Sequence, residues 1–341
     1  MSPPLLRVED LRVSFVSPHG RVQAVDGVSF EVASGEILAV VGESGSGKSV
    51  TALTLIGLTR VPGVRIEGVA TLRELDLLGA REDELEQIRG RRIATVFQDA
   101  LSALNPVYRV GDQIAEQIRA HEDVGRSTAR GRAVELLGRV GIPRAKERAR
   151  AFPHELSGGM RQRATIAMAL SCEPELLVAD EPTTALDVTI QAQILGLLAE
   201  LRDEAGIAVV LITHDLGVVA EVADRVAVMY AGQIVEAGSL EEVFYDPQHP
   251  YTWGLLGCIS RVDRPRTANL PAIPGRPPSL TAPPSGCRFA PRCPHSFPPC
   301  ATPPPLAIRA GHPDRCWLEP TEKRLRRVVE GRIGLVAGAT R

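Results

Sequence analysis

Three groups of residues in this 341-residue chain combine types and spacings that support chemistry. The first is a glycine-rich run of the form G-x-x-x-x-G-K-S, made of Gly42, Glu43, Ser44, Gly45, Ser46, Gly47, Lys48 and Ser49. Glycines let a backbone curl so that its N–H groups face an anion, and a helix that follows adds its positive dipole end. We expect this P-loop to bind a nucleotide, with Lys48 on the β- and γ-phosphates, Ser49 on Mg²⁺, and Val50 beside them.

The second group is a pair of acids at the end of an apolar segment, where Leu176–Ala179 leads into Asp180 and Glu181. Neighbouring carboxylates at the exit of a buried strand suit metal-assisted hydrolysis, because one binds Mg²⁺ and the other acts on a water. We expect Asp180 to bind the metal and Glu181 to orient or deprotonate the water.

The third group is a set of four cysteines, separated by five, six and fifteen residues: Cys287, Cys293, Cys300 and Cys316. A reducing compartment disfavours disulfides, so these thiols are candidates for holding a metal. Structural zinc usually takes closer pairs such as C-x₂-C, whereas a [4Fe–4S] cluster accepts wider spacings. Reduced thiols without metal are the third alternative.

Other residues of the same types receive plainer interpretations. His295 and His312 lie near the cysteines, and we expect them on the surface, with a role as replacement ligands as the alternative. Cys172 and Cys258 stand alone in the sequence and are expected to be small buried hydrophobes.

These groups need elements to position them, and the hydrophobic pattern predicts where those elements lie. Alternating residues predict half-buried strands over Leu11–Val16 and Val28–Val32. Continuous apolar runs predict buried parallel strands over Ile37–Val41, Leu176–Ala179 and Ala208–Thr213. Helical periodicity covers Ser49–Leu58, Arg161–Leu170 and Thr189–Arg202. The alternation predicts an α/β domain with a mainly parallel sheet, and 104–155 is interpreted as a helical insertion.

Prolines divide the chain, since 18 of the 27 lie between Pro247 and Pro320. The break near residue 246 predicts a change from a packed domain to an irregular, loop-rich one. The last stretch, Glu322–Arg341, is expected to be a short helix or a disordered end.

Composition limits the classes of function. A formal net charge of −2 argues against a dedicated nucleic-acid binder, because phosphate neutralisation supplies most of that affinity. No apolar run approaches the ~18 residues of a membrane span, and the first residues do not resemble a signal peptide. We therefore expect a cytoplasmic chain.

The pattern as a whole resembles the ABC ATPase family. Besides the P-loop and the acid pair, Leu156–Arg163 reads LSGGMRQR and resembles the family signature. Ser157, Gly158 and Gly159 would open a helix and offer a second anion site there. In the family, the signature of one subunit closes over the nucleotide on the P-loop of another. The resemblance therefore implies a head-to-tail dimer that encloses two ATP molecules.

Further positions match family motifs and take their roles from the resemblance. Phe15 matches the aromatic residue that stacks on adenine, although the family often has tyrosine there. Gln98 matches the glutamine that contacts Mg²⁺ and the attacking water and senses the membrane partner. Asp187 matches the dimer-interface aspartate, and His214 the switch histidine at the γ-phosphate. With Glu181 and His214 present, the resemblance implies a hydrolysing site.

The branch of closest resemblance is that of ATPase subunits of oligopeptide/dipeptide importers. It is carried by VFQDALSALNP over Val96–Pro106, by EPTTALDVTIQAQ over Glu181–Gln193 and by His249-Pro250-Tyr251-Thr252. The branch usually has proline at Ala100, and this departure is expected to loosen a loop that meets the permease. The resemblance implies a nucleotide-binding domain over 1–245, with a helical subdomain at about 104–165. It also implies a C-terminal region over 246–341 with the four-cysteine motif.

The resemblance also implies partners. We expect a second ATPase subunit, more often a homologue than an identical copy, two membrane permeases and an extracytoplasmic solute-binding protein. The chain would then lie peripherally on the cytoplasmic face of the membrane. The cysteines are expected to hold a [4Fe–4S] cluster, with zinc as the alternative. Import of nickel or another small solute remains an alternative, as does a non-transport ATPase of DNA repair or translation.

Overall fold

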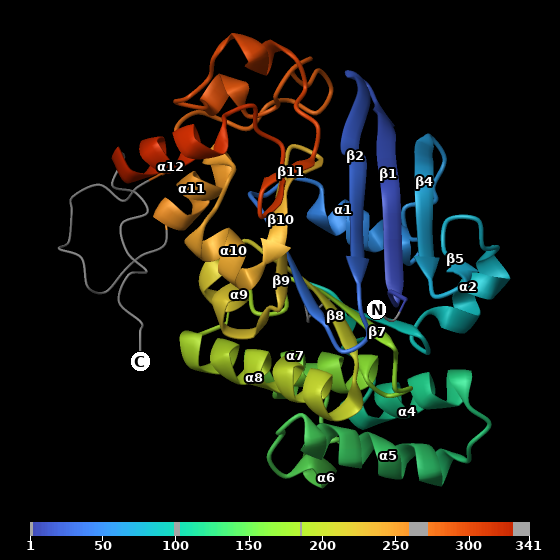
Figure 1. Cartoon of the computed structure of the whole chain (residues 1–341). Helices are drawn as coiled ribbons and strands as arrows, with labels where there is room; N and C mark the ends of the chain where they lie inside the picture. Colours follow the sequence, from blue (N-terminus) through green and yellow to red (C-terminus); the bar gives the residue numbers. More distant parts are fainter. Residues whose placement is uncertain (1–2, 99–102, 185, 259–271, 330–341) are drawn as a thin grey trace.

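The chain folds around one central sheet, shown in Figure 1, a computed structural model that describes residues 3–98, 103–184, 186–258 and 272–329. The strand order is β11-β12-β10-β9-β3-β8-β7-β6. The strands are β3 (Ile37–Val41), β6 (Ile93–Val96), β7 (Leu176–Asp180), β8 (Ala208–Thr213), β9 (Arg225–Tyr230), β10 (Gln233–Ser239), β11 (Ala307–Ala310) and β12 (His312–Asp314). The run from β9 to β6 is parallel, and the other three strands pair antiparallel. The predicted α/β fold with a mainly parallel sheet is confirmed.

Strand β3 shows why these segments are continuously apolar. All five of its residues are buried. Ile37, Ala39 and Val41 contribute to one hydrophobic core, and Leu38 and Val40 contribute to another on the opposite face. Because successive side chains of a strand point to opposite faces, a strand covered on both sides has no polar positions. The predicted bounds of β3 and β8 agree with those of the structure.

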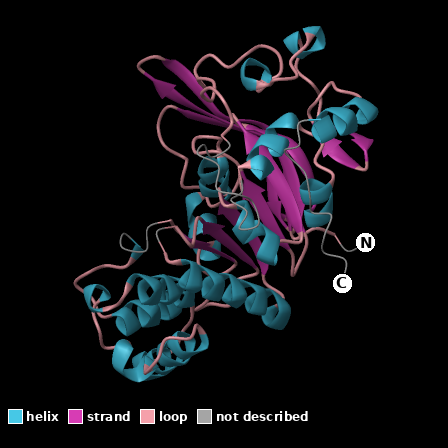
Figure 2. Cartoon of the chain, turned by 90° about the vertical axis from the view of Figure 1, so that its left-hand side faces the viewer, coloured by secondary structure: helices cyan, strands magenta, loops and turns pink. Residues whose placement is uncertain are grey.

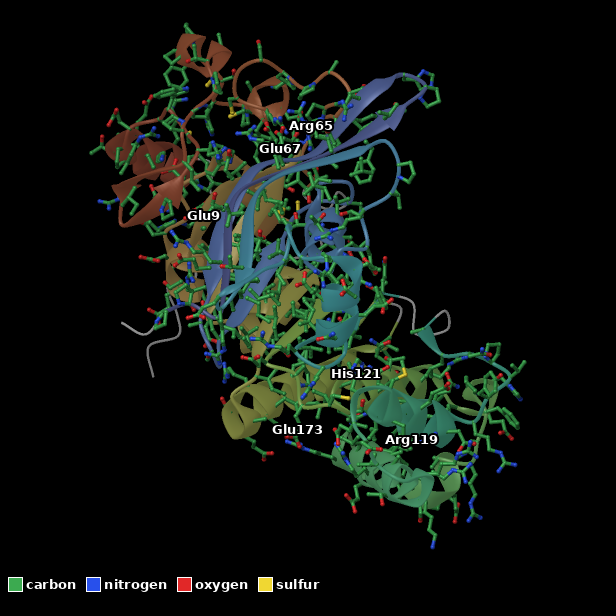
Figure 3. The ribbon with its side chains drawn as sticks, turned by 90° about the vertical axis from the view of Figure 1, so that its right-hand side faces the viewer. Glu9, Arg65, Glu67, Arg119, His121 and Glu173 are labelled. Carbon is green, nitrogen blue, oxygen red and sulfur yellow. The ribbon has the colours of Figure 1, made fainter. Side chains whose placement is uncertain are left out.

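A second, antiparallel sheet covers one face of the central sheet. Its order is β2-β1-β4-β5, formed by β1 (Leu6–Ser17), β2 (Gly20–Val32), β4 (Val64–Leu72) and β5 (Leu75–Asp76). Its inner residues, such as Leu11 and Val13, are buried in the same core as Leu38. Charged side chains occupy other positions, and Figure 3 labels Arg65 and Glu67 on β4. The two half-buried strands expected from alternation are present, whereas this layer as a whole was not predicted.

Helices cover both faces and extend below the sheet, as Figure 2 shows from the side. They are α1 (Lys48–Leu55), α2 (Glu82–Ile88), α4 (Val110–His121), α5 (Arg126–Arg139), α6 (Ala145–Arg148), α7 (Gly158–Ala169), α8 (Val188–Ala205), α9 (Leu216–Val222), α10 (Leu240–Tyr245), α11 (Pro250–Gly257) and α12 (Pro320–Val329). Helices α4, α5 and α7 pack together by buried alanine, isoleucine and leucine side chains. None of the described helices is long and apolar enough to span a membrane.

The C-terminal residues return to the central sheet rather than forming a detached unit. In this region the short 3₁₀ turns Ala290–Arg292 and Pro298–Ala301 are separated by irregular backbone. A further 3₁₀ turn, Pro153–Glu155, lies among the helices of the nucleotide-binding part. The β11–β12 hairpin then pairs with β10, where Glu236 is opposite Asp314. Of the expected terminal helix or disordered end, α12 is observed and 330–341 lie outside the described residues. The departure at Ala100 also lies outside them.

Candidate functional site

Four adjacent parallel strands bring the first two groups of residues to one edge of the sheet. The P-loop follows β3, His214 follows β8, Glu181 follows β7, and Gln98 follows β6. These strands are neighbours in the order β3-β8-β7-β6. In open α/β sheets, ligands bind beyond the carboxyl ends of the strands, which is where these residues lie.

The P-loop requires two of its glycines for steric reasons. Gly42 has φ 153°, and a Cβ there would lie 2.1 Å from the carbonyl oxygen of Met229. Gly47 has φ 104°, and its Cβ would lie 2.4 Å from the carbonyl oxygen of Ala24. Both contacts are with backbone and cannot be relieved by a rotamer change. The loop is therefore held closely against β9 and β2 on one side, while Ser44 and Gly45 are exposed on the other.

Lys48 is buried at the first position of α1, and its ammonium group points into the loop. It donates to the carbonyl oxygens of Gly42 (2.7 Å) and Glu43 (3.0 Å), and to Oγ of Ser46 (3.4 Å). Burial lowers the pKa of Lys48, while the charges of Glu181 and Asp180 oppose that shift. The loop thus already surrounds a cation at the position where the sequence predicts phosphate contacts. Val50 is half-buried one turn into the same helix.

Asp180 is the carboxylate that best fits the expected Mg²⁺. It is buried, and its Oδ1 has no hydrogen-bond partner. Burial raises the pKa of Asp180, and a hydrogen bond from Ser49 partly offsets this. A buried carboxylate oxygen without a partner is costly and calls for an explanation such as an ion. Two of the three predicted Mg²⁺ ligands, Ser49 and Asp180, are therefore in contact, with an unused oxygen beside them. The third, Gln98, donates to Glu181.

Glu181 is held by three side chains from three different elements. Its Oε2 accepts from Nε2 of Gln98 (3.0 Å) and from Oγ1 of Thr184 (2.9 Å), and its Oε1 lies 3.0 Å from Nδ1 of His214. Burial alone would raise the pKa of Glu181. The hydrogen bonds of His214 and Thr184, together with the charge of Lys48, lower it below its usual range. The residue is thus a fixed, ionised carboxylate. Thr184 was not predicted, since its distance in space from Glu181 depends on the turn after β7.

The remaining predicted nucleotide residues lie on exposed parts of the structure. Ser157 caps α7 by accepting from the N–H of Met160, and it is exposed together with Gly158; Gly159 is half-buried. Asp187 caps α8 by accepting from the N–H of Ile190 and is also exposed.

Phe15 is half-buried on β1, opposite Val22. It therefore lies on the hairpin whose other strand, β2, carries Ala24 against the P-loop. This position is compatible with the stacking role that the resemblance implies, because the hairpin adjoins the nucleotide loop.

Two residues of the C-terminal region contact the P-loop, and neither contact was predicted. The hydroxyl of Tyr251 accepts from the N–H of Glu43 (2.9 Å). The guanidinium of Arg292 donates to both carboxylate oxygens of Glu43, at 2.7 and 3.0 Å. In the sequence, Tyr251 is notable only as part of His249-Pro250-Tyr251-Thr252, which indicates the family branch and not a contact. Arg292 is 249 residues from Glu43 in the sequence, so no local pattern could reveal the pair.

The four cysteines of the spaced set, Cys287, Cys293, Cys300 and Cys316, line one small pocket. Its other walls are apolar or imidazole side chains: His249, Pro250, Phe289, His295, Phe297, Trp317 and Leu318. All four cysteines are free thiols, and burial raises the pKa of Cys287 and, to about 12, the pKa of Cys293 and of Cys316. Among the described residues, no three His, Cys, Asp or Glu side chains meet closely enough to hold a single metal ion.

The expectations for four isolated residues were wrong. His312 is buried rather than on the surface, because its Nε2 pairs with Oε1 of Glu236 at 2.7 Å on the adjoining strand. His295 is half-buried against the ring of Trp253 and lines the cysteine pocket. Cys258 is exposed and Cys172 only partly buried, so neither is a fully buried hydrophobe.

Comparisons with known proteins agree with this geometry. Residues 25–184 match the family model "ABC transporter", and 235–300 match "Oligopeptide/dipeptide transporter, C-terminal region". The oligopeptide transport ATP-binding protein OppD of Bacillus subtilis is 54% identical over 84% of this chain and 80% of its own length. The dipeptide transport ATP-binding protein DppD of the same organism is 50% identical over 92% and 95%. The OppD of Escherichia coli is 48% identical over 94% and 95%.

Solved structures give the same picture for the nucleotide-binding part. A dimeric ATP-binding cassette in a post-hydrolysis state with ADP and Pi superposes with a TM-score of 0.63 at 27% identity. That match covers 69% of this chain and 98% of the cassette. The cbiO1 protein of Clostridium perfringens, part of an ABC transporter complex, superposes with a TM-score of 0.61 at 28% identity, over 72% and 92%.

Proposed function

The chain belongs to the family of ABC transporter ATP-binding subunits, in the oligopeptide/dipeptide branch, and from this premise we propose that it hydrolyses ATP to drive peptide import. The single observation that carries the proposal is the fixed, ionised Glu181, held by Gln98, Thr184 and His214 beside the P-loop. An ATPase needs a group that acts on water next to the γ-phosphate, and here such a group lies at the correct sheet edge.

The proposed mechanism follows from these residues. The P-loop amides and Lys48 bind the phosphates. Ser49 and Asp180 would hold Mg²⁺, which would neutralise charge on the phosphate oxygens. Glu181 orients the attacking water and accepts its proton as the water attacks the γ-phosphate in line. Gln98 and His214 fix the two oxygens of Glu181, so the carboxylate is in place before the reaction.

Replacing Glu181 by glutamine tests the assignment of the catalytic base. Glu181→Gln should retain ATP binding, because the phosphate contacts are untouched, and should lose turnover by about 10²-fold or more. Binding is measured with a fluorescent ATP analogue and turnover by phosphate release. Glu200→Gln, an exposed glutamate on α8, is the matched control and should hydrolyse ATP normally. Unchanged hydrolysis in Glu181→Gln would contradict the proposal.

We also propose that the active form is a head-to-tail dimer, with a homologous ATPase subunit rather than an identical copy. Its support is the exposure of Ser157, Gly158 and Asp187, whose polar groups would face a second subunit. The neighbouring Val188 is 82% exposed, which is unusual for an apolar residue and suits a contact surface. Mixing the purified chain with the candidate partner, with and without ATP, and measuring mass in solution tests this. A partner-independent homodimer would contradict it.

A membrane permease is the proposed partner at a further group of exposed apolar residues. Phe97, which directly precedes Gln98, is 39% exposed, and Val107 and Tyr108, further along the chain, are 71% and 57% exposed. A permease seated there would sense the state of Gln98 directly. The chain would then be peripheral on the cytoplasmic face of the membrane, and an extracytoplasmic solute-binding protein would deliver the peptide.

For the cysteine pocket we propose a [4Fe–4S] cluster. A cluster is larger than one ion and takes one cysteine at each of four irons. The support for it is that all four thiols line one pocket, as the ligands of a single cluster would. Cys287, Cys293, Cys300 and Cys316 would hold it, and its chemistry there would be structural, linking irregular backbone.

Protein purified without oxygen tests the cluster. We expect absorbance near 400 nm and about four irons and four sulfides per chain. Cys293→Ser should lower the iron content and the thermal stability of the C-terminal region. One zinc per chain, or four free thiols and no metal, would each overturn the cluster and leave the ATPase proposal standing.

A further inference from the structure

Arg292, directly before Cys293, is one of the two residues of the C-terminal region that contact the P-loop. We propose that Arg292 is a positioning residue for the nucleotide site, which holds the P-loop in its ATP-binding shape through Glu43. The inference rests on the proposed ATP site and adds to it a residue from outside the nucleotide-binding part of the chain. It also makes ATP affinity depend on the conformation of the loop that carries the cysteines.

Arg292 is itself fully fixed. Besides the two bonds to Glu43, Nε donates to the carbonyl oxygen of Pro274 (2.9 Å) and Nη2 to that of Ile273 (3.2 Å). Nη1 also donates to the hydroxyl of Tyr230 (3.3 Å), and the guanidinium lies over that ring. The side chain is 4% exposed. A planar guanidinium with every nitrogen engaged presents a rigid, two-pronged partner to the carboxylate.

Glu43 transmits this restraint to the functional atoms of the P-loop. Its carboxylate accepts from Arg292 and its N–H donates to Tyr251, so two residues of the C-terminal region hold Glu43 by its side chain and its backbone. Its carbonyl oxygen accepts from Nζ of Lys48 (3.0 Å) and from the N–H of Ser46 (3.2 Å). The path from Arg292 to the phosphate-binding lysine therefore passes through a single residue.

The exposed side of the loop shows why this restraint matters for binding. Ser44 and Gly45 face solvent, and a Cβ at Gly45 would meet nothing within 4 Å. Such a segment loses conformational freedom when ATP binds, and this cost reduces affinity. By fixing the preceding residue, Arg292 has already removed part of that freedom. Loss of Arg292 should therefore weaken ATP binding even in a chain that folds normally.

The cysteine pocket is linked to Glu43 through the same residue, Arg292. Arg292 ends the short turn Ala290–Arg292, and the next residue, Cys293, lines the cysteine pocket. Any rearrangement of the pocket that moves this turn also moves the partner of Glu43. Coupling of this kind is reciprocal, so ATP should in turn restrain the turn.

ATP affinity of the full chain tests the inference. We expect Arg292→Met and Glu43→Gln each to raise the Kd for a fluorescent ATP analogue with Mg²⁺ roughly 5- to 150-fold, the usual span of coupled sites. The double variant should bind no more weakly than the weaker single variant, because both remove one interaction. The KM for ATP should rise more than kcat falls, and Arg292→Lys should recover part of the affinity.

Arg315→Met is the matched control. Arg315 also anchors the C-terminal region, because it donates to the carbonyl oxygens of Ile234 and Pro304. Neither of these two acceptors belongs to the P-loop. Arg315→Met should destabilise the region and leave the Kd unchanged. Hydrogen exchange of the 287–293 amides should slow on adding ATP to wild type, and not to Arg292→Met.

The outcomes separate the two proposals. A wild-type Kd in folded Arg292→Met, or additive losses in the double variant, would overturn the positioning role while leaving the ATPase intact. Equal losses of ATP affinity in Arg292→Met and Arg315→Met would mean that Arg292 is only a structural contact, and would also overturn the positioning role. A wild-type chain that binds no ATP would instead overturn the proposed function itself.

Discussion

At the scale of single residues, two neighbouring carboxylates of the site differ in their hydrogen bonds and in the direction of their pKa shifts. Asp180 is buried with an oxygen lacking a partner, and its pKa is raised chiefly by burial. Glu181, one residue later, adopts φ 47° and turns towards three hydrogen-bonding side chains. Burial raises its pKa, and the hydrogen bonds of His214 and Thr184 outweigh that effect and lower it. Two adjacent acids therefore have different roles, one suited to a metal and one to a water.

The acid limb of the pH profile follows from Glu181. Because its pKa is lowered, the carboxylate stays ionised as pH falls, and activity should be lost only below the usual range of glutamate. Thr184→Ala removes one of the bonds that favour the ionised form, so the acid limb of kcat should move to higher pH. Thr184→Ser keeps the hydroxyl and should restore the original profile. An identical acid limb in both variants would contradict the role of Thr184.

At the scale of elements, two helix caps of the same type have different neighbours. Ser157 caps α7 at the proposed dimer surface, and Ser239 caps α10 by accepting from the N–H of Glu242. Each hydroxyl satisfies one amide at a helix start, and its loss costs about 1 kcal/mol. Comparing the two separates stability from function.

Ser157→Ala and Ser239→Ala should therefore lower stability by similar amounts, about 1 kcal/mol. Only Ser157→Ala should reduce ATP turnover by the assembled transporter, on the order of tenfold, because its hydroxyl would face the nucleotide of the partner subunit. ATP binding by the isolated chain should be unchanged in both. Thermal unfolding and phosphate release measure the two effects, and equal turnover in the two variants would contradict the dimer arrangement.

Elements whose signal is local were predictable, and elements defined by distant contacts were not. The strands β3 and β8 are apolar on both faces, so their bounds followed from composition alone. Strand β4 has only two buried residues among its nine, which hides its pairing with β1. The roles of Glu43 and Tyr251 depend on a contact between residues 208 positions apart, which no window of sequence contains.

At the scale of the whole molecule, buried charges attach the C-terminal region to the central sheet. Lys323 on α12 donates to Oδ1 of Asp314 at 2.7 Å, and both side chains are about 1% exposed or less. On the adjoining strand, Glu236 accepts from the N–H groups of Gln248 and His249 and pairs with His312. Helix α12, β12 and β10 are thus joined by ionic contacts in the interior.

Lys323→Met should destabilise this attachment by about 3–5 kcal/mol, because it leaves the carboxylate of Asp314 buried and without its cation. The double variant Lys323→Met with Asp314→Leu should recover much of the loss, since no isolated charge remains. Lys146→Met, at an exposed lysine, is the control and should be neutral. Thermal unfolding of the full chain measures all three, and a neutral Lys323→Met would contradict the ionic attachment.

The pairing of Glu43 with Arg292 also has a consequence for biosynthesis. A ribosome adds about 5–20 residues per second, so Arg292 is synthesised roughly 12–50 s after Glu43, which precedes it by 249 positions. Throughout that interval the nascent P-loop lacks its brace. We therefore expect an unfinished chain that ends before Arg292 to bind ATP more weakly than the complete chain.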